Sequence, residues 1–328
     1  MGDIEDPDCV SHREMLARDA RVPKGHFEAC ELHEFGLLLM KIKKRSPPQL
    51  RFRSKDSLFK SRIRRFRLIS LWQIKTPRMD SEFDLVSLID KLAGANLKDG
   101  DILVISSKFV GISEGRIVRL KTVNVSRSAK DLSAKYAISP ELCELIIRES
   151  DEIIGGVPGF LLALKNGLFT PNAGIDKSNI AHGSVVLYPR RPLESAILIR
   201  GGLKFSRGVN VGVVICDSRL MPTRRGTTGV ALAAAGLEGI RDLRGKCDLF
   251  GNVLRVTSQA IADDLSSAAQ LAMGESDEAS PIVIVRGLGN QVVKEANYES
   301  RDFAIPTEQC VYMRSLGYRT KKKNRLAS

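Results

Sequence analysis

Strand-length apolar runs and amphipathic helical patterns follow one another without a regular order, and this mixture limits the folds open to the chain. The strongest apolar runs lie at 101–107, 209–216 and 281–286, and each has the length of a buried strand. All are far shorter than the roughly 18 apolar residues that span a bilayer. We predict no strand after 281–286. Because no regular βαβ alternation is present, the sequence predicts an α+β fold instead of a doubly wound sheet.

Helix and turn signals divide the segments between these runs. Amphipathic helices are predicted over 83–94, 126–137, 140–149 and 258–273. Ser81 is the predicted cap of the first helix and Gly94 its stop. Ser139 followed by Pro140 marks the start of the third helix. Asn166-Gly167 separates two short apolar runs, which predicts a hairpin with a tight turn.

Most of the net charge of +13 lies outside this mixed region. Residues 1–40 contain 4 basic and 9 acidic side chains, and residues 41–67 contain 12 basic and 1 acidic. Residues 319–328 contain 5 basic side chains and none that is acidic. We therefore predict a poorly ordered N-terminal extension over 1–67 with a strongly basic second half, a nearly neutral domain over 68–318 and a basic tail over 319–328.

The basic segment 41–67 has a composition that suits nucleic acid or acidic lipid. Phe52, Phe59 and Phe66 recur every seven residues, which allows a basic amphipathic helix. Two interpretations are open: a solvated leader and a nucleic-acid-binding element. The acidic residues at 1–8 do not resemble a signal peptide, and the six cysteines include no CxxC pair. A cytoplasmic protein with reduced thiols and no membrane segment is expected.

Several common catalytic motifs are missing from the sequence. It contains no GxxxxGK[ST], no GxGxxG followed by a suitable acid, and no GxSxG. His182 is the one histidine of 68–318, and its neighbour Gly183 indicates an exposed turn. The remaining candidates are carboxylates at the ends of predicted elements, namely Asp176, Asp217 and Glu275. Such oxygen donors suit hard divalent cations.

Basic and polar residues near these acids suit a phosphoryl site. Arg224 and Arg225 follow Asp217, and the arginine fork matches phosphate oxygens. Lys108 follows a predicted strand, and Asn179 lies close to Asp176 in the sequence. Each of these residues also has a purely structural interpretation as a cap, a turn residue or part of a solvated loop.

Five stretches together resemble the coenzyme F420-0:L-glutamate ligase family. They are 171–179 (PNAGIDKSN), 211–236, 242–254, 262–275 (ending in AMGE) and 281–288. The resemblance extends over about 70–318. It implies the α+β, mixed-sheet ligase fold of that family in an intertwined homodimer. It also implies a reaction that joins L-glutamate to a carboxylate of F420-0, driven by hydrolysis of GTP through an acyl phosphate.

The resemblance further implies roles for individual residues. Asp176 and Asp217 would be ligands of one divalent cation, and Ser218 and Glu275 of a second. The cations would be Mg²⁺ or Mn²⁺, with K⁺ as a further candidate. Asp217 is an expected catalytic residue. Arg225 is the other, on the chemistry of its guanidinium group and not on the resemblance. Nucleotide contacts are expected from Thr76, Pro77, Arg78, Met79, Ser107, Lys108, Asn179, Met273, Gly274, Glu275, Ser276, Asp277, Glu278, Ala279 and Ser280.

Two departures from the family pattern leave details open. Ile112 stands where the family commonly has lysine, and 276–280 replaces a glycine-rich stretch. These departures leave the choice between GTP and ATP open. The sequence also does not decide the cation or the number of glutamates added. Three alternatives remain: a ligase for another acidic cofactor, an F420-binding carrier without catalysis, and a nucleic-acid-binding protein that uses 41–67.

Overall fold

A computed structural model of the chain describes residues 68–288 and 293–318. The predictions for the extension 1–67, its basic segment 41–67 and the tail 319–328 lie outside the described residues. Among the described helices, none combines the length and the apolar character needed to cross a membrane.

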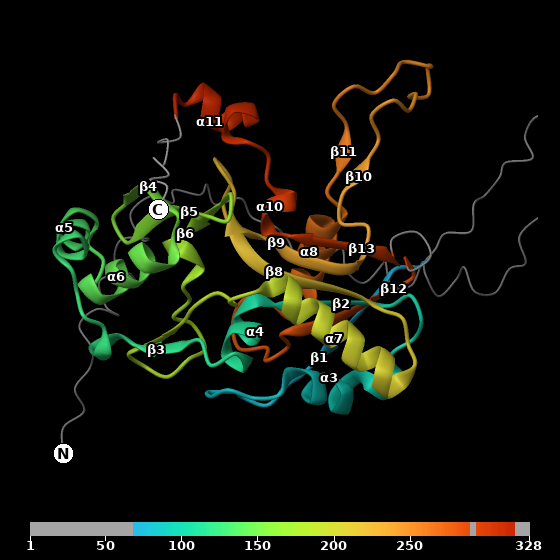
Figure 1. The fold of residues 1–328 in the computed structure, drawn as a ribbon, viewed down its shortest axis with the longest axis horizontal. Coiled ribbons are helices and arrows are strands. Elements are labelled where there is room, and N and C mark those ends of the chain that lie inside the picture. The colour runs from blue at the N-terminus through green and yellow to red at the C-terminus, as the bar shows by residue number, and fades with distance from the viewer. Residues whose placement is uncertain (1–67, 289–292, 319–328) are drawn as a thin grey trace, which may run out of the picture. The chain divides into compact units, whose positions relative to one another are not determined.

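A six-stranded mixed sheet forms the centre of the described domain (Figure 1). Its strand order is β1-β12-β2-β8-β9-β13. The strands are β1 (Ser70–Ile74), β12 (Ile282–Arg286), β2 (Ile102–Ser106), β8 (Gly212–Leu220), β9 (Thr227–Leu237) and β13 (Val293–Glu299). Strands β2 and β8 pair in parallel, and the other neighbouring pairs in this sheet are antiparallel. The predicted α+β class with a mixed sheet is confirmed.

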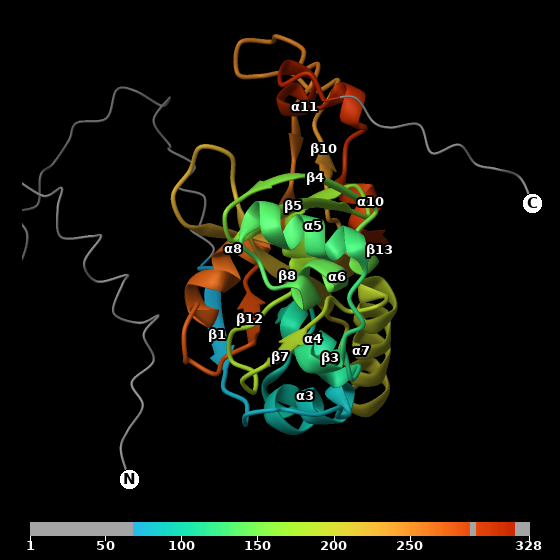
Figure 2. The ribbon, with the colours of Figure 1, turned by 90° about the vertical axis from the view of Figure 1, so that its left-hand side faces the viewer.

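Helices cover both faces of the sheet, as Figure 2 shows for α7 and α8. The helices are α3 (Leu85–Ala93), α7 (Pro192–Arg207) and α8 (Ile261–Met273). On β2, Leu103 and Ile105 enter the core shared with α3 and α7. Ile102 and Val104 enter the core shared with α8. Alternate residues of a strand point to opposite faces of the sheet. Because β2 is covered on both faces, its side chains are apolar along nearly its whole length.

A smaller layer packs around a third core. It contains β3 (Ile117–Arg119), α5 (Arg127–Tyr136), α6 (Pro140–Glu149), β4 (Glu152–Val157), β5 (Phe160–Lys165), β6 (Leu168–Pro171) and β7 (Ser184–Val186). Strands β4, β5 and β6 form one small sheet, and β3 pairs with β7. This layer carries Asp176, which forms an isolated bridge with Val186 of β7.

The remaining elements are short. They are α4 (Ser107–Ser113), β10 (Arg241–Asp242), β11 (Ser258–Gln259), α10 (Ser300–Phe303), α11 (Val311–Ser315) and the 3₁₀ turns η3 (Gly94–Asn96), η4 (Leu120–Thr122), η5 (Asn172–Gly174) and η6 (Thr307–Gln309). Strands β10 and β11 pair at the base of a projecting loop, and we call residues 241–259 the arm (Figure 1).

The sequence predicted several of these elements correctly. Helix α6 has the predicted bounds, and Ser139 caps it through a hydrogen bond from the amide of Leu142. The predicted hairpin is formed by β5 and β6. Asn166 and Gly167 between them have φ of 50° and 80°, the left-handed values of a tight hairpin turn.

Other boundaries were predicted wrongly. Asp84, not Ser81, caps α3, because its carboxylate accepts a hydrogen bond of 3.0 Å from the amide of Ser87. The helix predicted over 258–273 begins at Ile261, since the preceding residues form β11. Strand β12 is not the last, because β13 follows it. Strand β8 continues to Leu220, so Asp217 lies within a strand and not at its end.

Glu144 of α6 gives a prediction about stability. Its carboxylate accepts hydrogen bonds from the amide of Ser126 (2.9 Å) and from Nε of Arg148 (2.8 Å). The hydrogen bonding from Ser126, reinforced by Arg148, lowers the pKa of Glu144 from 4.5 to about 2. The carboxylate therefore stabilises the fold above pH 4.5, and this contribution is lost as the pH falls toward 2.

Glu144→Gln should accordingly lower the melting temperature at pH 7, where the native carboxylate is ionised. The difference from the wild type should shrink steadily as the pH is lowered below about 4.5. Thermal unfolding followed by circular dichroism at several pH values measures it. Glu141→Gln on the same helix is the control, and a pH-independent difference for Glu144→Gln would contradict the prediction.

Candidate functional site

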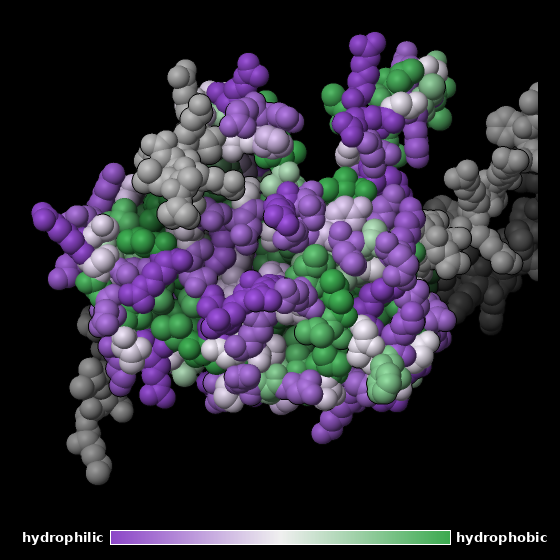
Figure 3. Space-filling view, in the orientation of Figure 1, coloured by the Kyte–Doolittle hydropathy of each residue, from purple (hydrophilic) through white to green (hydrophobic). Residues whose placement is uncertain are grey.

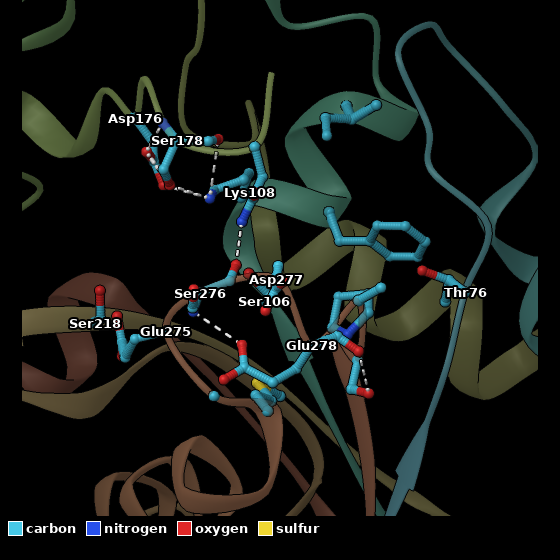
Figure 4. A pocket seen from close by; sticks show the side chains of 18 of the residues that line it. Thr76, Ser106, Lys108, Asp176, Ser178, Ser218, Glu275, Ser276, Asp277 and Glu278 are labelled. Atoms are coloured by element: carbon cyan, nitrogen blue, oxygen red, sulfur yellow. Dashed lines mark hydrogen bonds and ion pairs between the residues drawn. The ribbon is translucent and has the colours of Figure 1, made fainter. Parts of the chain in front are cut away.

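A pocket of about 590 Å³ opens where β2 ends and β8 passes beneath the loop that connects α8 to β12. Figure 4 shows the side chains of residues that line it. The structure brings together nearly all site residues predicted from the sequence. The lining includes Thr76, Pro77, Arg78, Met79, Lys108, Asp176, Asn179, Asp217, Ser218, Met273, Gly274, Glu275, Ser276, Asp277, Glu278, Ala279 and Ser280.

Two predicted site residues do not line the pocket. Ser107 lies behind it, where its hydroxyl donates a hydrogen bond of 2.8 Å to Oδ1 of Asp217. Its hydroxyl supports the acid, and a nucleotide contact from Ser107 stays a prediction. Arg225 lies in the exposed loop between β8 and β9. A catalytic role for Arg225 stays a prediction.

Asp217 carries a carboxylate directly after the buried part of β8, which ends at Cys216. Its Oδ1 accepts the hydrogen bond from Ser107, and its Oδ2 accepts one from the hydroxyl of Tyr188. Burial raises the pKa of Asp217 to about 6, and the negative charge of Asp176 contributes in the same direction. The two hydroxyl donors oppose this increase. The ionised form of Asp217 is thus unfavourable in this environment, and a nearby cation would stabilise it.

Asp176 is held by a lysine and by its own turn. Nζ of Lys108 lies 2.7 Å from Oδ2 of Asp176 and donates a hydrogen bond of 2.7 Å to the hydroxyl of Ser178. The amide and hydroxyl of Ser178 donate to Oδ1 of Asp176 at 2.6 and 2.8 Å. Figure 4 shows this group at the pocket wall. The position beside Asp176 therefore accommodates a positive charge, which here is the ammonium group of Lys108.

The loop between α8 and β12 forms the opposite wall and carries Glu275. Gln270 of α8 donates a hydrogen bond to the carboxylate of Glu275. The amide side chain of Asn179 donates to the carbonyl of Ser276. The amide of Thr76 donates to the carbonyl of Ala279 at 2.9 Å. The loop is therefore tied both to the Asp176 segment and to the residues that follow β1.

Gly274 has a left-handed backbone conformation where α8 turns into this loop. Its φ of +74° is strained for other residues. A Cβ atom at this position would lie 2.1 Å from the carboxyl carbon of Glu278. The carboxylate of Glu278 also accepts a hydrogen bond of 2.8 Å from the amide of Ser276. The Cβ clash falls on the movable end of the Glu278 side chain, so the positive φ is what favours glycine at this position.

Negative charge predominates in the pocket. Five carboxylates line it, against the two basic residues Arg78 and Lys108. Within 68–288 and 293–318, no three His, Cys, Asp or Glu side chains form a ready-made metal cluster. The donor set nevertheless fits a hard divalent cation, because Asp176 and Asp217 repel each other and the hydroxyl of Ser218 supplies a further oxygen. Such a cation would neutralise charge that the pocket itself leaves uncompensated.

The structure also places two other residues that the sequence analysis discussed, His182 and Ile112. His182 lies in an exposed turn, as predicted. Ile112 is 4% exposed and lines the pocket from α4, so it adds an apolar surface at this wall.

Sequence reasoning missed Tyr188, Ser178 and Gln270, each of which donates a hydrogen bond to an acid of the site. Ser178 could have been found, because an aspartate two residues before a serine is a common Asx-turn pattern. Gln270 lies five residues before Glu275, at the end of α8, where the two side chains meet as the chain leaves the helix. Tyr188 reaches Asp217 through the tertiary fold, and no local pattern marks it.

The fold and the site together define an α+β protein with a carboxylate-rich ligand pocket at one end of a mixed sheet. Comparison with known proteins gives the family. The model of the F420-0:Gamma-glutamyl ligase family matches residues 73–287, a stretch that contains every residue lining the pocket. The chain belongs to this family, and the resemblance found in the sequence is confirmed.

Curated proteins of similar sequence match this chain over most of their own length. The coenzyme F420:L-glutamate ligase of Methanopyrus kandleri is 39% identical over 206 residues, which are 62% of this chain and 81% of that protein. The protein of the same name from Methanocaldococcus jannaschii is 36% identical over 228 residues, 69% of this chain and 90% of that protein. The one from Archaeoglobus fulgidus is 38% identical over 205 residues, with 62% and 82% covered.

Proposed function

We propose that this protein is a ligase that adds L-glutamate to coenzyme F420-0 through an amide bond, with GTP as the phosphoryl donor. The observation that carries the proposal is the convergence of Asp176, Asp217 and Glu275 in one pocket of a chain of this family. These residues lie far apart in the sequence. Their shared lining of a pocket beside Lys108 is what a polyphosphate site with cations needs.

The chemistry follows from the weakness of a carboxylate as an electrophile. An oxygen of the acceptor carboxylate attacks the γ-phosphorus of GTP, so that an acyl phosphate forms and GDP leaves. The amine of L-glutamate then attacks the acyl carbon, expels inorganic phosphate and loses a proton. Both steps depend on positioning and charge neutralisation, which explains how a domain with a single, exposed histidine can perform them.

The residues of the pocket divide this work. Asp176, Asp217, Ser218 and Glu275 would hold Mg²⁺ or Mn²⁺, which when bound neutralises phosphate charge. Lys108 and Arg78 supply positive charge from the protein itself. Asn179 and the loop 273–280 enclose the nucleotide. Nothing in this division requires a covalent bond between the protein and a substrate.

The decisive experiment is mass spectrometry of F420-0 incubated with the protein, GTP, L-glutamate and Mn²⁺ or Mg²⁺. We expect a mass gain of one or more glutamyl units, together with GDP. Replacing GTP by ATP tests nucleotide choice, and folate-like acceptors test whether another acidic cofactor is the substrate. GTP hydrolysis without a glutamyl product, or no turnover at all, would contradict the proposal.

We also propose that two copies of the chain associate, as the sequence resemblance implies. Hydrophobic side chains gather at the end of the arm (Figure 3). Leu249, Phe250 and Val256 are 101%, 91% and 88% exposed. Apolar side chains so open to water favour burial against another surface, and the equivalent surface of a second copy offers it.

A further inference from the structure

Tyr188 joins the smaller layer of the domain to the acid on the central sheet. It follows β7 by two residues, its side chain is 8% exposed, and its hydroxyl donates to Oδ2 of Asp217. Ser107 donates to the other oxygen, Oδ1, at 2.8 Å. Each oxygen of the Asp217 carboxylate is thus held by one hydroxyl group. The rotation of the carboxylate is fixed before any ligand arrives.

The tyrosine is itself held from several directions. A Cβ atom on Gly174 would lie 2.1 Å from Cε1 of the Tyr188 ring, so only glycine permits this close approach. Nε of Arg116 donates a hydrogen bond of 3.0 Å to the carbonyl of Tyr188. The ammonium group of Lys165 lies 5.5 Å from the centroid of the ring. Backbone and ring are therefore both restrained.

An ion cluster anchors these restraints. Arg116 and Lys165 both contact the carboxylate of Glu149, at 2.8 and 2.6 Å. All three side chains are less than one fifth exposed, so solvent screens their interaction only weakly. The position of Tyr188 is consequently tied to the small sheet and to α6, and not only to the neighbouring strand β7.

Strand β7, which precedes Tyr188, also positions Asp176. The amide of Asp176 donates to the carbonyl of Val186 at 3.0 Å, and the amide of Val186 donates back at 2.9 Å. Val186 precedes Tyr188 by two residues, so one short stretch of chain carries the partner of Asp217 and the partner of Asp176. The hydrogen bond from Tyr188 therefore fixes where Asp217 lies relative to Asp176.

We propose that Tyr188 is a positioning residue that holds Asp217 in the orientation required to bind a divalent cation together with Asp176. This proposal rests on the proposed function, because it assigns the pair of acids to a cation. Tyr188 does not touch the cation or the substrate; it acts through Asp217. Groups that orient a metal ligand from behind commonly change metal affinity about 10- to 100-fold when they are removed.

Tyr188→Phe tests the role, because phenylalanine keeps the ring against Gly174 and Lys165 and removes only the hydroxyl. Binding of Mn²⁺ alone to the full-length, nucleotide-free protein is measured by electron paramagnetic resonance of the free ion. We expect the dissociation constant to rise by about tenfold or more in the variant. Tyr312→Phe, whose side chain is 58% exposed on α11, is the matched control and should bind Mn²⁺ like the wild type.

Ser107→Ala provides a second variant that does not alter the packing of the ring. It removes the donor to Oδ1 of Asp217 and should also weaken Mn²⁺ binding. In steady-state assays, both variants should need more Mn²⁺ for half-maximal activation. A merely structural role of Tyr188 would lower the melting temperature without changing the dissociation constant.

The outcomes separate this proposal from the proposed function. If the wild type binds Mn²⁺ and forms the glutamyl product while Tyr188→Phe binds Mn²⁺ equally well, the positioning role is overturned and the function stands. If the wild type does not bind Mn²⁺, the assignment of Asp176 and Asp217 to a cation falls, and the positioning role falls with it. Loss of folding in Tyr188→Phe transfers the test to Ser107→Ala, and unchanged binding there overturns the proposal.

Discussion

Asp217→Asn is expected to reduce formation of the glutamyl product by more than about a hundredfold while the protein stays folded. Removing a group that merely orients a metal ligand already costs about 10- to 100-fold. Asp217 is proposed to be a ligand itself, and asparagine keeps its shape but removes its charge. The loss should therefore exceed that range and should not be recovered by raising the Mn²⁺ concentration within the range that saturates the wild type.

The fold should tolerate this change because the charge at Asp217 opposes folding. Burial raises the pKa of Asp217 to about 6 from 3.8, so the ionised form is less favourable in the folded protein than in the unfolded chain. An asparagine side chain can still accept from one hydroxyl and donate to the other, which preserves contact with Ser107 and Tyr188. The melting temperature in metal-free buffer should be equal to or above that of the wild type.

Product formation by mass spectrometry and thermal unfolding together measure this prediction. Asp263→Asn is the matched control, because burial also raises the pKa of Asp263, and its carboxylate accepts a hydrogen bond of 2.8 Å from the amide of Ala231 outside the pocket. That variant should retain turnover. Full activity in Asp217→Asn would contradict the assignment of Asp217 to the reaction.

The acids of the site were predictable from the sequence because few other residues of 68–318 were candidates for catalysis. With a single histidine in 68–318 and no common phosphate-binding motif, Asp176, Asp217 and Glu275 stood out as oxygen donors near predicted element ends, and the family resemblance assigned them together. Their meeting in one pocket required the structure. Asp176 belongs to the smaller layer and Asp217 to the central sheet, and no local pattern encodes how two layers pack.

Elements that the sequence failed to predict have local physical reasons. Strand β13 has the polar sequence VKEANYE and, among the described strands, pairs with β9 alone at the edge of the sheet. It therefore lacks the apolar run that marked the buried strands. Helix α4 spans seven residues and includes Gly111, which is too short and too weak a helical pattern to detect. Strand β8 extends beyond its buried half because β9 pairs with it as far as Leu220.

The hydrogen-bond partners of the acids were the least predictable part of the site. Ser107 lies 110 residues before Asp217, and Tyr188 lies 29 residues before it. A serine after a strand indicates a possible phosphate contact as readily as a support for a carboxylate. The sequence predicted a nucleotide contact for Ser107, which stays a prediction. It did not predict the hydrogen bond from the Ser107 hydroxyl to Asp217, because only the tertiary arrangement brings the two residues together.

Lys108→Met is expected to raise the KM for GTP by about 10- to 100-fold, with a similar loss of affinity for a non-hydrolysable GTP analogue. Lys108 is one of two basic residues in a pocket lined by five carboxylates, so its removal leaves phosphate groups facing uncompensated negative charge. A hydrogen bond to a charged group contributes about 1.5–3 kcal/mol, and each 1.4 kcal/mol corresponds to tenfold in affinity.

The variant should show a different pattern from Tyr188→Phe when Mn²⁺ alone is titrated. The ammonium group of Lys108 lies 2.7 Å from Oδ2 of Asp176, so its removal frees an oxygen of that acid and withdraws a competing positive charge. Affinity for Mn²⁺ should therefore stay the same or increase while affinity for the nucleotide falls. Lys177→Met is the control: this exposed lysine follows Asp176 directly and does not line the pocket. Equal nucleotide affinities in the two variants would show that Lys108 does not contact phosphate, whereas weaker Mn²⁺ binding in Lys108→Met would show that it supports the cation site instead.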